Sequence, residues 1–251
     1  MTRYGLIGRR LDYSFSRGYF TEKFAREGLR DREYLNFEIE SLRELPRVLA
    51  TPGLAGLNVT IPFKRDVVAH LDALDETARG VGAVNCIRFA GSRLVGYNTD
   101  VDGVLATLDA VDYPGGDDAA DPIVLGTGGA AAAVAFALSR LGQSAQRVSR
   151  DPDAGQLGYD QLAQLDWTAP RLIVNATPVG TYPAVDRAPA LPYERLGPQH
   201  TAFDLVYNPA ETLFLSRARA RGARTTNGRT MLYAQAEAAW RIWNAQPART
   251  P

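Results

Sequence analysis

Residues that build disulfide frameworks and metal centres are nearly absent from this sequence. Its 251 residues include 1 cysteine and 2 histidines. A single cysteine excludes an intrachain disulfide framework and fits a reducing compartment. His70 and His200 stand outside any metal-ligand spacing, and no Gly-x-Ser-x-Gly turn marks a serine hydrolase. We therefore expect no metal site, and Cys86 is interpreted as a small packing residue.

Net charge and long hydrophobic runs are also missing. Lys plus Arg and Asp plus Glu both number 28, so the chain as a whole has no basic field that would attract nucleic acid. The first residues lack the apolar stretch of a signal peptide, and no segment approaches the length of a membrane span. We expect a cytoplasmic protein without nucleic-acid or membrane partners. The formal glycosylation sequons at residues 58–60 and 175–177 are accordingly set aside.

Short apolar strands alternate with helical patterns along the chain, which predicts an α/β fold. Strands are expected at residues 4–8, 34–39, 54–61, 85–89, 93–97, 123–125, 145–148, 171–178 and 201–209. Helices are expected at residues 16–28, 64–74, 100–110, 210–222 and 230–244, and after the glycine-rich turn at 126–128. Asn208 and Pro209 predict the N-cap and first turn of the helix at 210–222.

The segment 111–122 interrupts this alternation. It is polar and rich in Gly, Pro and Asp, as loops and linkers are. Beyond it the strand–helix pattern begins again. Two domains are therefore expected, and the last helix is free to return to the first of them.

A dinucleotide-binding pattern opens the second half of the chain. Gly126, Gly128 and Ala131 follow an apolar strand and begin an alanine-rich helix, in the spacing Gly-x-Gly-x-x-Ala. The first glycine permits a tight turn, and the second lets a pyrophosphate approach the helix N-terminus. A plain strand–helix turn is the alternative, but the flanking strand and helix favour cofactor binding.

The next strand ends in Ser149, Arg150 and Asp151. An NAD site normally places Asp or Glu at this point to bind the ribose hydroxyls, whereas an arginine suits the 2′-phosphate of NADP. Arg150 as a solvated surface charge is the simpler alternative. Asp151 comes one or two places late for the NAD role, so NADP is the predicted cofactor.

Polar side chains stand at strand ends and turns in the first half of the chain. They are Ser14, Ser16, Asn58, Thr60, Lys64, Asn85 and Asp100. Open α/β sheets bind ligands at the carboxyl ends of their strands, and these groups suit a small, oxygen-rich, anionic substrate. Taken singly, the serines and Asp100 are also plausible helix N-caps, and Asn85 a turn cap. Their recurrence at successive strand ends favours a ligand site.

Eight segments, in this order, resemble the shikimate dehydrogenases, which reduce 3-dehydroshikimate with NADPH. They are SFS (14–16), NVTIPFK (58–64), GAVN (82–85), GYNTD (96–100), GTGGAA (126–131), VNATPVG (174–180), DLVYNP (204–209) and NGRTMLYAQA (227–236). The resemblance implies a step of chorismate and aromatic amino acid biosynthesis. It also implies an N-terminal α/β substrate domain, residues 1–101 with 228–251, and a Rossmann-type doubly wound NADP-binding domain, residues 102–227. The active site would lie in the cleft between them, in a monomer or a homodimer.

The resemblance also assigns roles by position. Lys64 and Asp100 match the catalytic pair. Positions around the substrate match Ser14, Ser16, Asn58, Thr60, Asn85, Tyr207 and Gln235. Positions around the cofactor match Gly126, Thr127, Gly128, Gly129, Ala130, Ala131, Ser149, Arg150, Thr177 and Gly228. The chain has Ser149-Arg150-Asp151 where Asn-Arg-Thr is common in the family, and Arg17 where Pro commonly follows the second serine.

The chemistry of the side chains agrees with these roles. Lys64, as an ammonium, can hydrogen-bond a ketone oxygen and protonate it while hydride reaches the carbon. Serine and tyrosine hydroxyls can donate to a carboxylate, and amides can bind ring hydroxyls. Two alternatives remain: a quinate/shikimate dehydrogenase that uses NAD, suggested by Asp151, and a dinucleotide-sensing protein without turnover.

Overall fold

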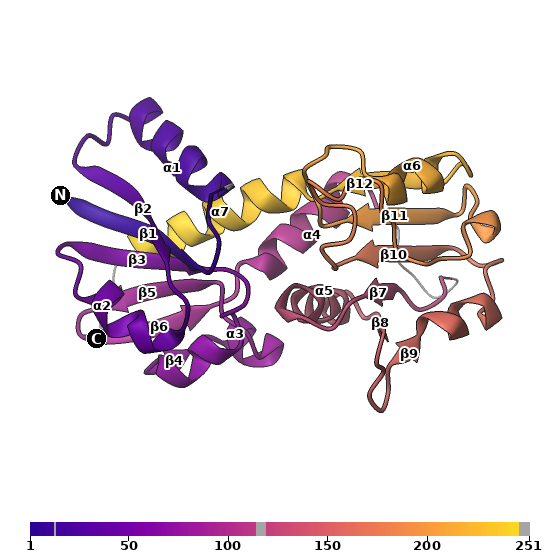
Figure 1. Cartoon of the computed structure of the whole chain (residues 1–251), viewed down its shortest axis with the longest axis horizontal. Helices are drawn as coiled ribbons and strands as arrows, with labels where there is room; N and C mark the ends of the chain where they lie inside the picture. Colours follow the sequence, from indigo (N-terminus) through magenta and orange to yellow (C-terminus); the bar gives the residue numbers. More distant parts are fainter. Residues whose placement is uncertain (13, 114–118, 246–251) are drawn as a thin grey trace. The chain divides into compact units, whose positions relative to one another are not determined.

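The computed structural model describes residues 1–12, 14–113 and 119–245. The chain forms two compact units. The first comprises Met1–Thr99 and the segment that begins at Ala236, and the second comprises Asp100–Gln235. Each unit holds a six-stranded sheet with helices, so the predicted α/β class is confirmed (Figure 1). The roles predicted for residues 1–101 with 228–251 and for 102–227 stay predictions.

A mixed sheet forms the centre of the first unit, in the strand order β2-β1-β3-β5-β6-β4. Its strands are β1 (Thr2–Gly8), β2 (Arg32–Glu38), β3 (Leu54–Val59), β4 (Ala73–Leu74), β5 (Cys86–Ala90) and β6 (Arg93–Tyr97). Its helices are α1 (Phe15–Arg26), α2 (Leu45–Leu49), α3 (Glu76–Val81), the 3₁₀ turns η1 (Leu42–Glu44) and η2 (Asp66–His70), and the later part of α7 (Arg229–Asn244). β5 runs antiparallel to β6, which confirms the predicted hairpin, and it also runs antiparallel to β3.

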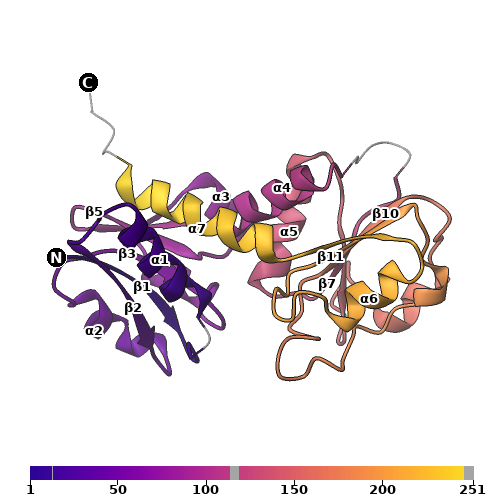
Figure 2. The same cartoon turned by 90° about the horizontal axis from the view of Figure 1, so that it is seen from above.

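Alternating side chains give this sheet two buried faces. Ile7 and Leu57 pack on one face against the segments around α2 and η2. Tyr4 and Leu6 pack on the other face against α1 and α7 (Figure 2). There Trp243 lies so close to the sheet that a Cβ at Gly56 would overlap its ring. Asn58, two residues after Gly56 in β3, points to this same face.

The second unit contains an all-parallel sheet in the order β12-β11-β10-β7-β8-β9. Its strands are β7 (Ile123–Leu125), β8 (Gln146–Ser149), β9 (Leu157–Gly158), β10 (Arg171–Asn175), β11 (His200–Asp204) and β12 (Arg224–Asn227). Its helices are α4 (Asp100–Ala110), α5 (Gly129–Arg140), α6 (Leu213–Arg219), and the 3₁₀ turns η3 (Tyr159–Gln164) and η4 (Tyr193–Arg195). With β7 as first strand, this is the doubly wound 3-2-1-4-5-6 order of dinucleotide-binding folds, whose ligand crevice opens between β7 and β10.

One predicted helix is wrong, and another begins later than predicted. The helix expected over 64–74 is a short 3₁₀ turn at Asp66–His70 followed by β4. Pairing overrides the helical pattern there, because the Asp72 backbone N–H donates to the Leu94 carbonyl and Ala73 lies opposite Val95 of β6.

The helix expected over 210–222 starts at Leu213, and its N-cap is Thr212 rather than Asn208. The Thr212 hydroxyl accepts a hydrogen bond from the Leu215 N–H, whereas the Asn208 carbonyl accepts one from the N–H of Tyr182. Residues 114–118 of the linker predicted at 111–122 lie outside the described residues.

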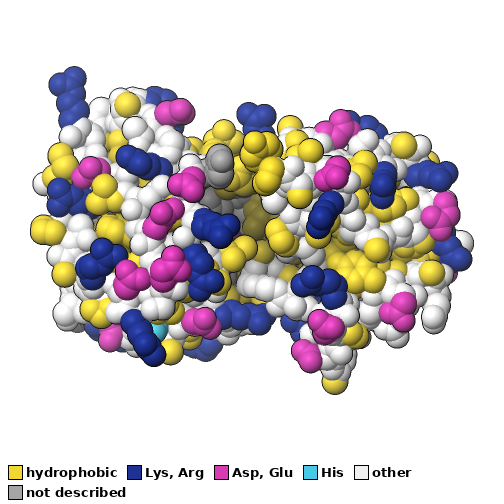
Figure 3. Space-filling view, viewed as in Figure 1, with side chains coloured by type: hydrophobic (Ala, Val, Ile, Leu, Met, Phe, Trp, Pro, Cys, Tyr) yellow, Lys and Arg dark blue, Asp and Glu magenta, His cyan; other side chains and the backbone are white. Residues whose placement is uncertain are grey.

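Charges of both signs are interspersed on the face drawn in Figure 3, as the equal numbers of acidic and basic residues lead one to expect. Within residues 1–12, 14–113 and 119–245, no helix combines the length and the apolar character that crossing a membrane requires.

Candidate functional site

The first part of the candidate site lies at one edge of the first unit's sheet. Strands β1, β3 and β6 end at this edge, and β5 begins there. The register shows this, because Ile7 pairs with Val59, and Cys86 pairs with both Asn58 and Tyr97. The predicted substrate residues of this unit are attached to these strand ends or to the turns next to them.

Asn58 is buried and held by two hydrogen bonds. Its carboxamide oxygen accepts from the Tyr34 hydroxyl at 2.8 Å, and its Nδ2 donates to the Asn85 carbonyl at 3.2 Å. Burial raises the pKa of Tyr34 well above its usual range, and a side-chain hydrogen bond with Ser16 offsets this in part. The structure therefore links Ser16, Tyr34 and Asn58 in one chain of polar contacts.

Asn85 organises the neighbouring turn. Its Oδ1 accepts from the Thr99 backbone N–H at 2.7 Å, and its Nδ2 donates to the Thr99 hydroxyl at 3.0 Å. Asn98 adds a bond to the Ala83 carbonyl at 2.8 Å. These contacts match the turn-cap interpretation of Asn85. They also fix the backbone that leads directly to Asp100, the buried first residue of α4.

Lys64 lies half-buried in the turn after β3. Its backbone carbonyl accepts a hydrogen bond from the Val84 N–H at 2.7 Å, which places Lys64 beside the turn that carries Asn85. Thr60 is also half-buried, and its N–H donates to the Ile7 carbonyl at 2.9 Å. The first unit thus brings Lys64, Thr60, Asn58 and Asn85 to the same edge.

Ser14 occupies the N-cap position of α1 but does not act as a cap. Its hydroxyl oxygen is buried and has no hydrogen-bond partner among the residues that the structure describes. A buried hydroxyl without a partner is costly, so such a group calls for an explanation. A ligand oxygen would satisfy it, which supports the substrate interpretation of Ser14 over the capping one.

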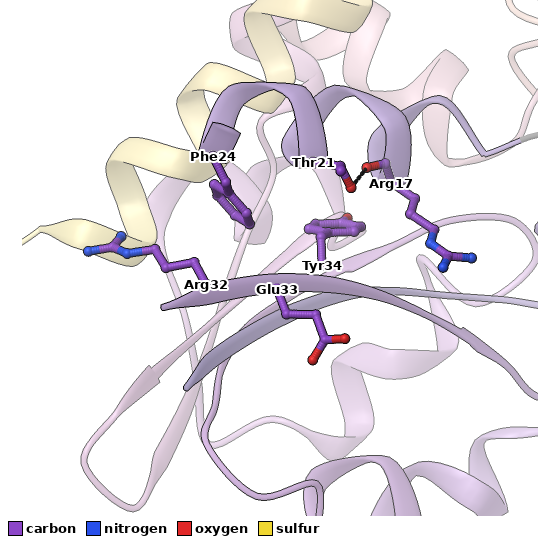
Figure 4. A pocket seen from close by; sticks show the side chains of 6 residues that line it. All are labelled: Arg17, Thr21, Phe24, Arg32, Glu33 and Tyr34. Carbon is purple, nitrogen blue, oxygen red and sulfur yellow. Dashed lines mark hydrogen bonds between the residues drawn. The ribbon is translucent and has the colours of Figure 1, made fainter. Parts of the chain in front are cut away.

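A separate pocket of about 240 Å³ opens between α1 and β2. It is lined by Arg17, Thr21, Phe24, Arg32, Glu33 and Tyr34. In Figure 4 the side chains of Arg17 and Arg32 extend in opposite directions, so their charges do not converge on one point. Tyr34 belongs both to this pocket and, through its hydroxyl, to the contacts of Asn58. None of the predicted site residues lines it.

The second part of the site is the glycine turn between β7 and α5. Gly126 has a φ of +107°, and a Cβ there would lie 3.2 Å from Cγ2 of Thr177. Only glycine fits this backbone without strain. Gly128 is the exposed N-cap of α5, and a Cβ on it would meet no described atom within 4 Å.

This open helix start fits a pyrophosphate. The first N–H groups of a helix have no partner within the helix and carry partial positive charge. Helix α5 has 12 residues, and Ala131 in its first turn is fully buried. Gly129, Ala130 and Thr127 are each half-buried beside the turn. The residues present therefore fit the phosphates of a dinucleotide.

The end of β8 folds into a local turn. The Ser149 hydroxyl donates to the Asp151 carbonyl at 2.9 Å and lies 3.2 Å from the Asp151 N–H. Arg150 is exposed, and its positive charge partly offsets the rise that burial causes in the pKa of Tyr159. Arg150 therefore lies near Tyr159, at the start of η3. Asp151 is exposed as well.

The remaining predicted residues follow β10, β11 and β12 or lie in α7. Thr177 donates both its N–H and its hydroxyl to Oδ1 of Asn175, at 3.1 and 2.6 Å. Gly228 is buried, and a Cβ on it would overlap the Leu205 carbonyl. Tyr207 is 38% exposed, and Gln235 donates to the Leu232 carbonyl within α7.

The sequence analysis missed the fully buried Asn175, Asp204 and Thr212, which are joined to one another by hydrogen bonds, and of which Asn175 bonds Thr177. The available signal was a carboxylate at the end of the apolar run TAFD. In the part of the chain that the structure describes, no three His, Cys, Asp or Glu side chains gather as a metal ion would require.

Residues 6–87 match the model of the shikimate dehydrogenase substrate-binding domain. The chain is 36% identical to the shikimate dehydrogenase (NADP(+)) of Desulforamulus reducens, over 95% of this chain and 88% of that protein. It is 37% identical to the enzyme of the same name from Geobacillus kaustophilus, over 97% of this chain and 92% of that protein.

Solved structures agree with these relatives. A chorismate mutase/shikimate 5-dehydrogenase fusion protein from Clostridium acetobutylicum superposes with a TM-score of 0.85 at 34% identity, covering 97% of this chain and 91% of that one. Shikimate 5-dehydrogenase from Thermus thermophilus, in complex with NADP(H) and shikimate, gives 0.83 at 32% identity, covering 97% and 94%. Quinate dehydrogenase from Corynebacterium glutamicum, in complex with NAD, gives 0.83 at 28% identity, covering 97% and 93%. This chain belongs to the shikimate dehydrogenase family.

Proposed function

We propose that this protein is an NADP-dependent shikimate dehydrogenase, which catalyses the reversible reduction of 3-dehydroshikimate to shikimate in chorismate and aromatic amino acid biosynthesis. The observation that carries the proposal is the 36–37% identity, over nearly the whole chain, to relatives of that activity. The doubly wound sheet and the open start of α5 supply the dinucleotide site that this activity needs. As its physiological form we propose a cytoplasmic monomer or homodimer.

The predicted substrate residues bind and orient the substrate in this proposal. Asn58 and Asn85 bind ring hydroxyls, because a carboxamide can both donate and accept hydrogen bonds. The Ser14 hydroxyl, which has no partner among the described residues, donates to the substrate carboxylate, together with Ser16 and Tyr207. Thr60 and Gln235 complete the set of polar groups around the ring.

Lys64 and Asp100 form the acid–base pair. NADPH, when bound, supplies the hydride that reduces the ketone carbon. The Lys64 ammonium hydrogen-bonds the ketone oxygen, stabilises the charge that develops there and delivers the proton. In the oxidation direction the same pair removes the proton from the substrate hydroxyl.

Residues of the second unit hold the cofactor. The backbone of Gly126–Ala131 at the start of α5 binds the pyrophosphate, and Ser149 and Arg150 bind the 2′-phosphate. Thr177 and Gly228 shape the site at the ends of β10 and β12. One experiment tests the whole proposal: absorbance at 340 nm should rise when purified protein is mixed with shikimate and NADP⁺. A wild-type protein that binds NADP⁺ but produces no absorbance would instead be a dinucleotide sensor.

A quinate/shikimate dehydrogenase that uses NAD is the second candidate. Two observations favour it: Asp151 at the end of β8, and the similarity to a quinate dehydrogenase in complex with NAD. The same assay with each combination of shikimate or quinate and NADP⁺ or NAD⁺ separates the two. We expect the highest kcat/KM with shikimate and NADP⁺, and a higher value with quinate and NAD⁺ would favour the second candidate.

A further inference from the structure

A buried network of polar side chains joins the ends of β10 and β11. Asn175 and Asp204 pair across the two parallel strands, and both are fully buried. Oδ1 of Asp204 accepts from Nδ2 of Asn175 at 2.9 Å and from the Val206 N–H at 3.0 Å. Oδ2 accepts from the hydroxyl of Thr212 at 2.5 Å. Both carboxylate oxygens are therefore bonded.

The carboxylate dictates how the Asn175 amide is turned. An ionised carboxylate only accepts hydrogen bonds, so the NH₂ group of Asn175 must face Asp204. Its second N–H reaches the Val179 carbonyl at 3.2 Å. The Asn175 oxygen then points the other way, where it accepts from the N–H and the hydroxyl of Thr177.

Thr177 in turn borders the glycine turn. The methyl group of Thr177 lies 3.2 Å from where a Cβ on Gly126 would be, and the Ala176 N–H donates to the Leu125 carbonyl at 3.0 Å. This is the switch point of the doubly wound sheet, where such folds bind dinucleotides. A chain of hydrogen bonds thus runs from Asp204 through Asn175 to the wall of the cofactor site.

We infer that Asp204 is a positioning residue of the dinucleotide site: it orients Asn175, which holds Thr177 against the glycine turn, and its ionised form sets the affinity for the dinucleotide. This inference rests on the proposed function, because it requires that the second unit binds NADP. Asp204 itself touches neither substrate nor cofactor.

The ionisation of Asp204 supports a functional rather than a stabilising role. Burial raises the pKa of Asp204 to about 6, and the hydrogen bonds from Thr212, Val206 and Asn175 hold it from rising further. A carboxyl whose pKa is higher in the folded than in the unfolded chain stabilises the fold at low pH, and this stability is lost as the pH rises through the folded pKa. At neutral pH the ionised Asp204 therefore lowers folding stability, so the charge itself does not serve to hold the fold together.

Among the described residues that contact or interact with Asp204, Asp204 is the group whose pKa lies near 6. It faces the amides Asn175 and Asn227 of β10 and β12, and the neutral Thr212 at the N-cap of α6. Tyr193 of η4 is the titratable group that interacts with it, and the guanidinium of Arg217 lies 5.2 Å from the centre of that ring. Burial raises the pKa of Tyr193 far above its ordinary value, so it does not titrate between pH 5 and 8.

Direct NADP⁺ binding to the full chain, measured by calorimetry from pH 5 to 8, tests the inference. Asp204→Asn keeps the shape but replaces a charge-assisted hydrogen bond to Asn175 by a neutral one. We expect its Kd at pH 7.5 to rise about fivefold, with a melting temperature equal to or above that of the wild type. The 2′-phosphate of NADP⁺ also titrates near pH 6, but it affects the wild type and Asp204→Asn equally. The ratio of the two Kd values therefore isolates Asp204, and it should fall towards one below pH 6. Asp160→Asn, an exposed change in the same unit, should leave Kd unchanged.

Thr212→Val gives an independent reading that does not depend on how Asp204→Asn folds. The hydrogen bond from Thr212 lowers the pKa of Asp204, so its removal should move the midpoint of the pH dependence of Kd upward. A midpoint that stays in place in Thr212→Val overturns the inference, as does a Kd ratio near one at pH 7.5 for Asp204→Asn. If the wild-type chain binds no dinucleotide, both the proposed function and the inference about Asp204 fail. If the wild type binds NADP⁺ and both variants bind it with the same Kd and the same pH dependence, the inference fails and the proposed function stands.

Discussion

The Tyr34 hydroxyl donates to the carboxamide oxygen of Asn58 at 2.8 Å, and both side chains are buried. This bond fixes the orientation of the Asn58 amide, which is predicted to bind the substrate. Tyr34→Phe would leave the Asn58 oxygen buried without a donor, which costs about 1–3 kcal/mol of folding stability. We expect a lower melting temperature and a KM for shikimate raised several-fold. The Kd for NADP⁺ should be unchanged. If affinity for shikimate and for NADP⁺ falls equally, Tyr34 does not act locally on the substrate site.

Lys64 carries the strongest prediction for catalysis. Lys64→Ala should lower kcat by about 10²–10⁴, the usual contribution of a positioned acid–base group. The KM for shikimate should change far less, because the other polar groups still hold the ring. The adjacent Arg65 is exposed and serves as the matched control: Arg65→Ala should keep kcat within a few-fold. A Lys64→Ala enzyme that turns over as fast as this control would remove Lys64 from the mechanism.

Ser14→Ala separates substrate binding from helix capping. A capping serine contributes about 0.5–2 kcal/mol to stability. The Ser14 hydroxyl makes no capping bond among the described residues, so the melting temperature should not fall. The KM for shikimate should rise with little change in kcat, since carboxylate contacts are equally strong in the ground and transition states. The double variant Ser14→Ala with Ser16→Ala should raise KM further. A drop in stability with KM intact would restore the capping interpretation of Ser14.

Glu237 joins α7 to α1 in the first unit. It bonds the Tyr19 hydroxyl and lies 2.9 Å from Nζ of the buried Lys23, which also pairs with Glu27. Burial raises the pKa of Glu237, but the bonds from Tyr19 and Lys23 outweigh it, so the net pKa lies below the ordinary value. The resulting stability is present above the pKa of the unfolded chain and is lost as the pH falls through the folded pKa.

Glu237→Gln should therefore be less stable than the wild type at pH 7. The Glu237 side chain is 36% exposed, and solvent screening limits the expected difference to about 1 kcal/mol. Denaturant unfolding at a series of pH values should show the difference shrinking below about pH 4.5. A difference that does not depend on pH would mean that packing, rather than charge, joins the two helices here.

Local patterns were sufficient to predict much of this fold. The glycine turn, the hairpin at 85–97 and the alternation of the second unit depend on neighbours in the chain, and the structure contains all three. The polar residues at strand ends could also be found, because any strand in a sheet of this class delivers its last side chains to one edge. Residues 64–74 show the limit, since their helical spacing gave way to a pairing with β6 that the local sequence does not encode.

The buried network was beyond sequence reasoning for a related reason. Asn175 and Asp204 are 29 positions apart, and only the register of β10 against β11 brings them together. The same holds for Ser14, whose hydroxyl could not be separated from a helix cap until its surroundings were known. In both cases the missing information is which atoms fill the space around a polar group, and that depends on distant segments.

Cofactor choice is the last prediction, and it depends on Arg150. The exposed guanidinium stands at the end of β8, where doubly wound folds bind the adenosine ribose. A charge-assisted hydrogen bond to a 2′-phosphate contributes about 1.5–3 kcal/mol, and about 1.4 kcal/mol corresponds to a factor of ten. Arg150→Ala should therefore lower kcat/KM for NADPH by about 10- to 150-fold and leave NADH within a few-fold.

Asp151 is the residue that argues for NAD rather than NADP, and its substitution is the control for Arg150→Ala. Its N–H and carbonyl are both engaged with the Ser149 hydroxyl, so it takes part in the turn that follows Arg150. If that is its main role, Asp151→Asn should leave the preference for NADPH over NADH unchanged. If Asp151 instead binds ribose hydroxyls, the wild type should use NADH as readily as NADPH, and Asp151→Asn should weaken NADH most. Steady-state kinetics with both cofactors on the two variants decides between NADP and NAD as the physiological cofactor.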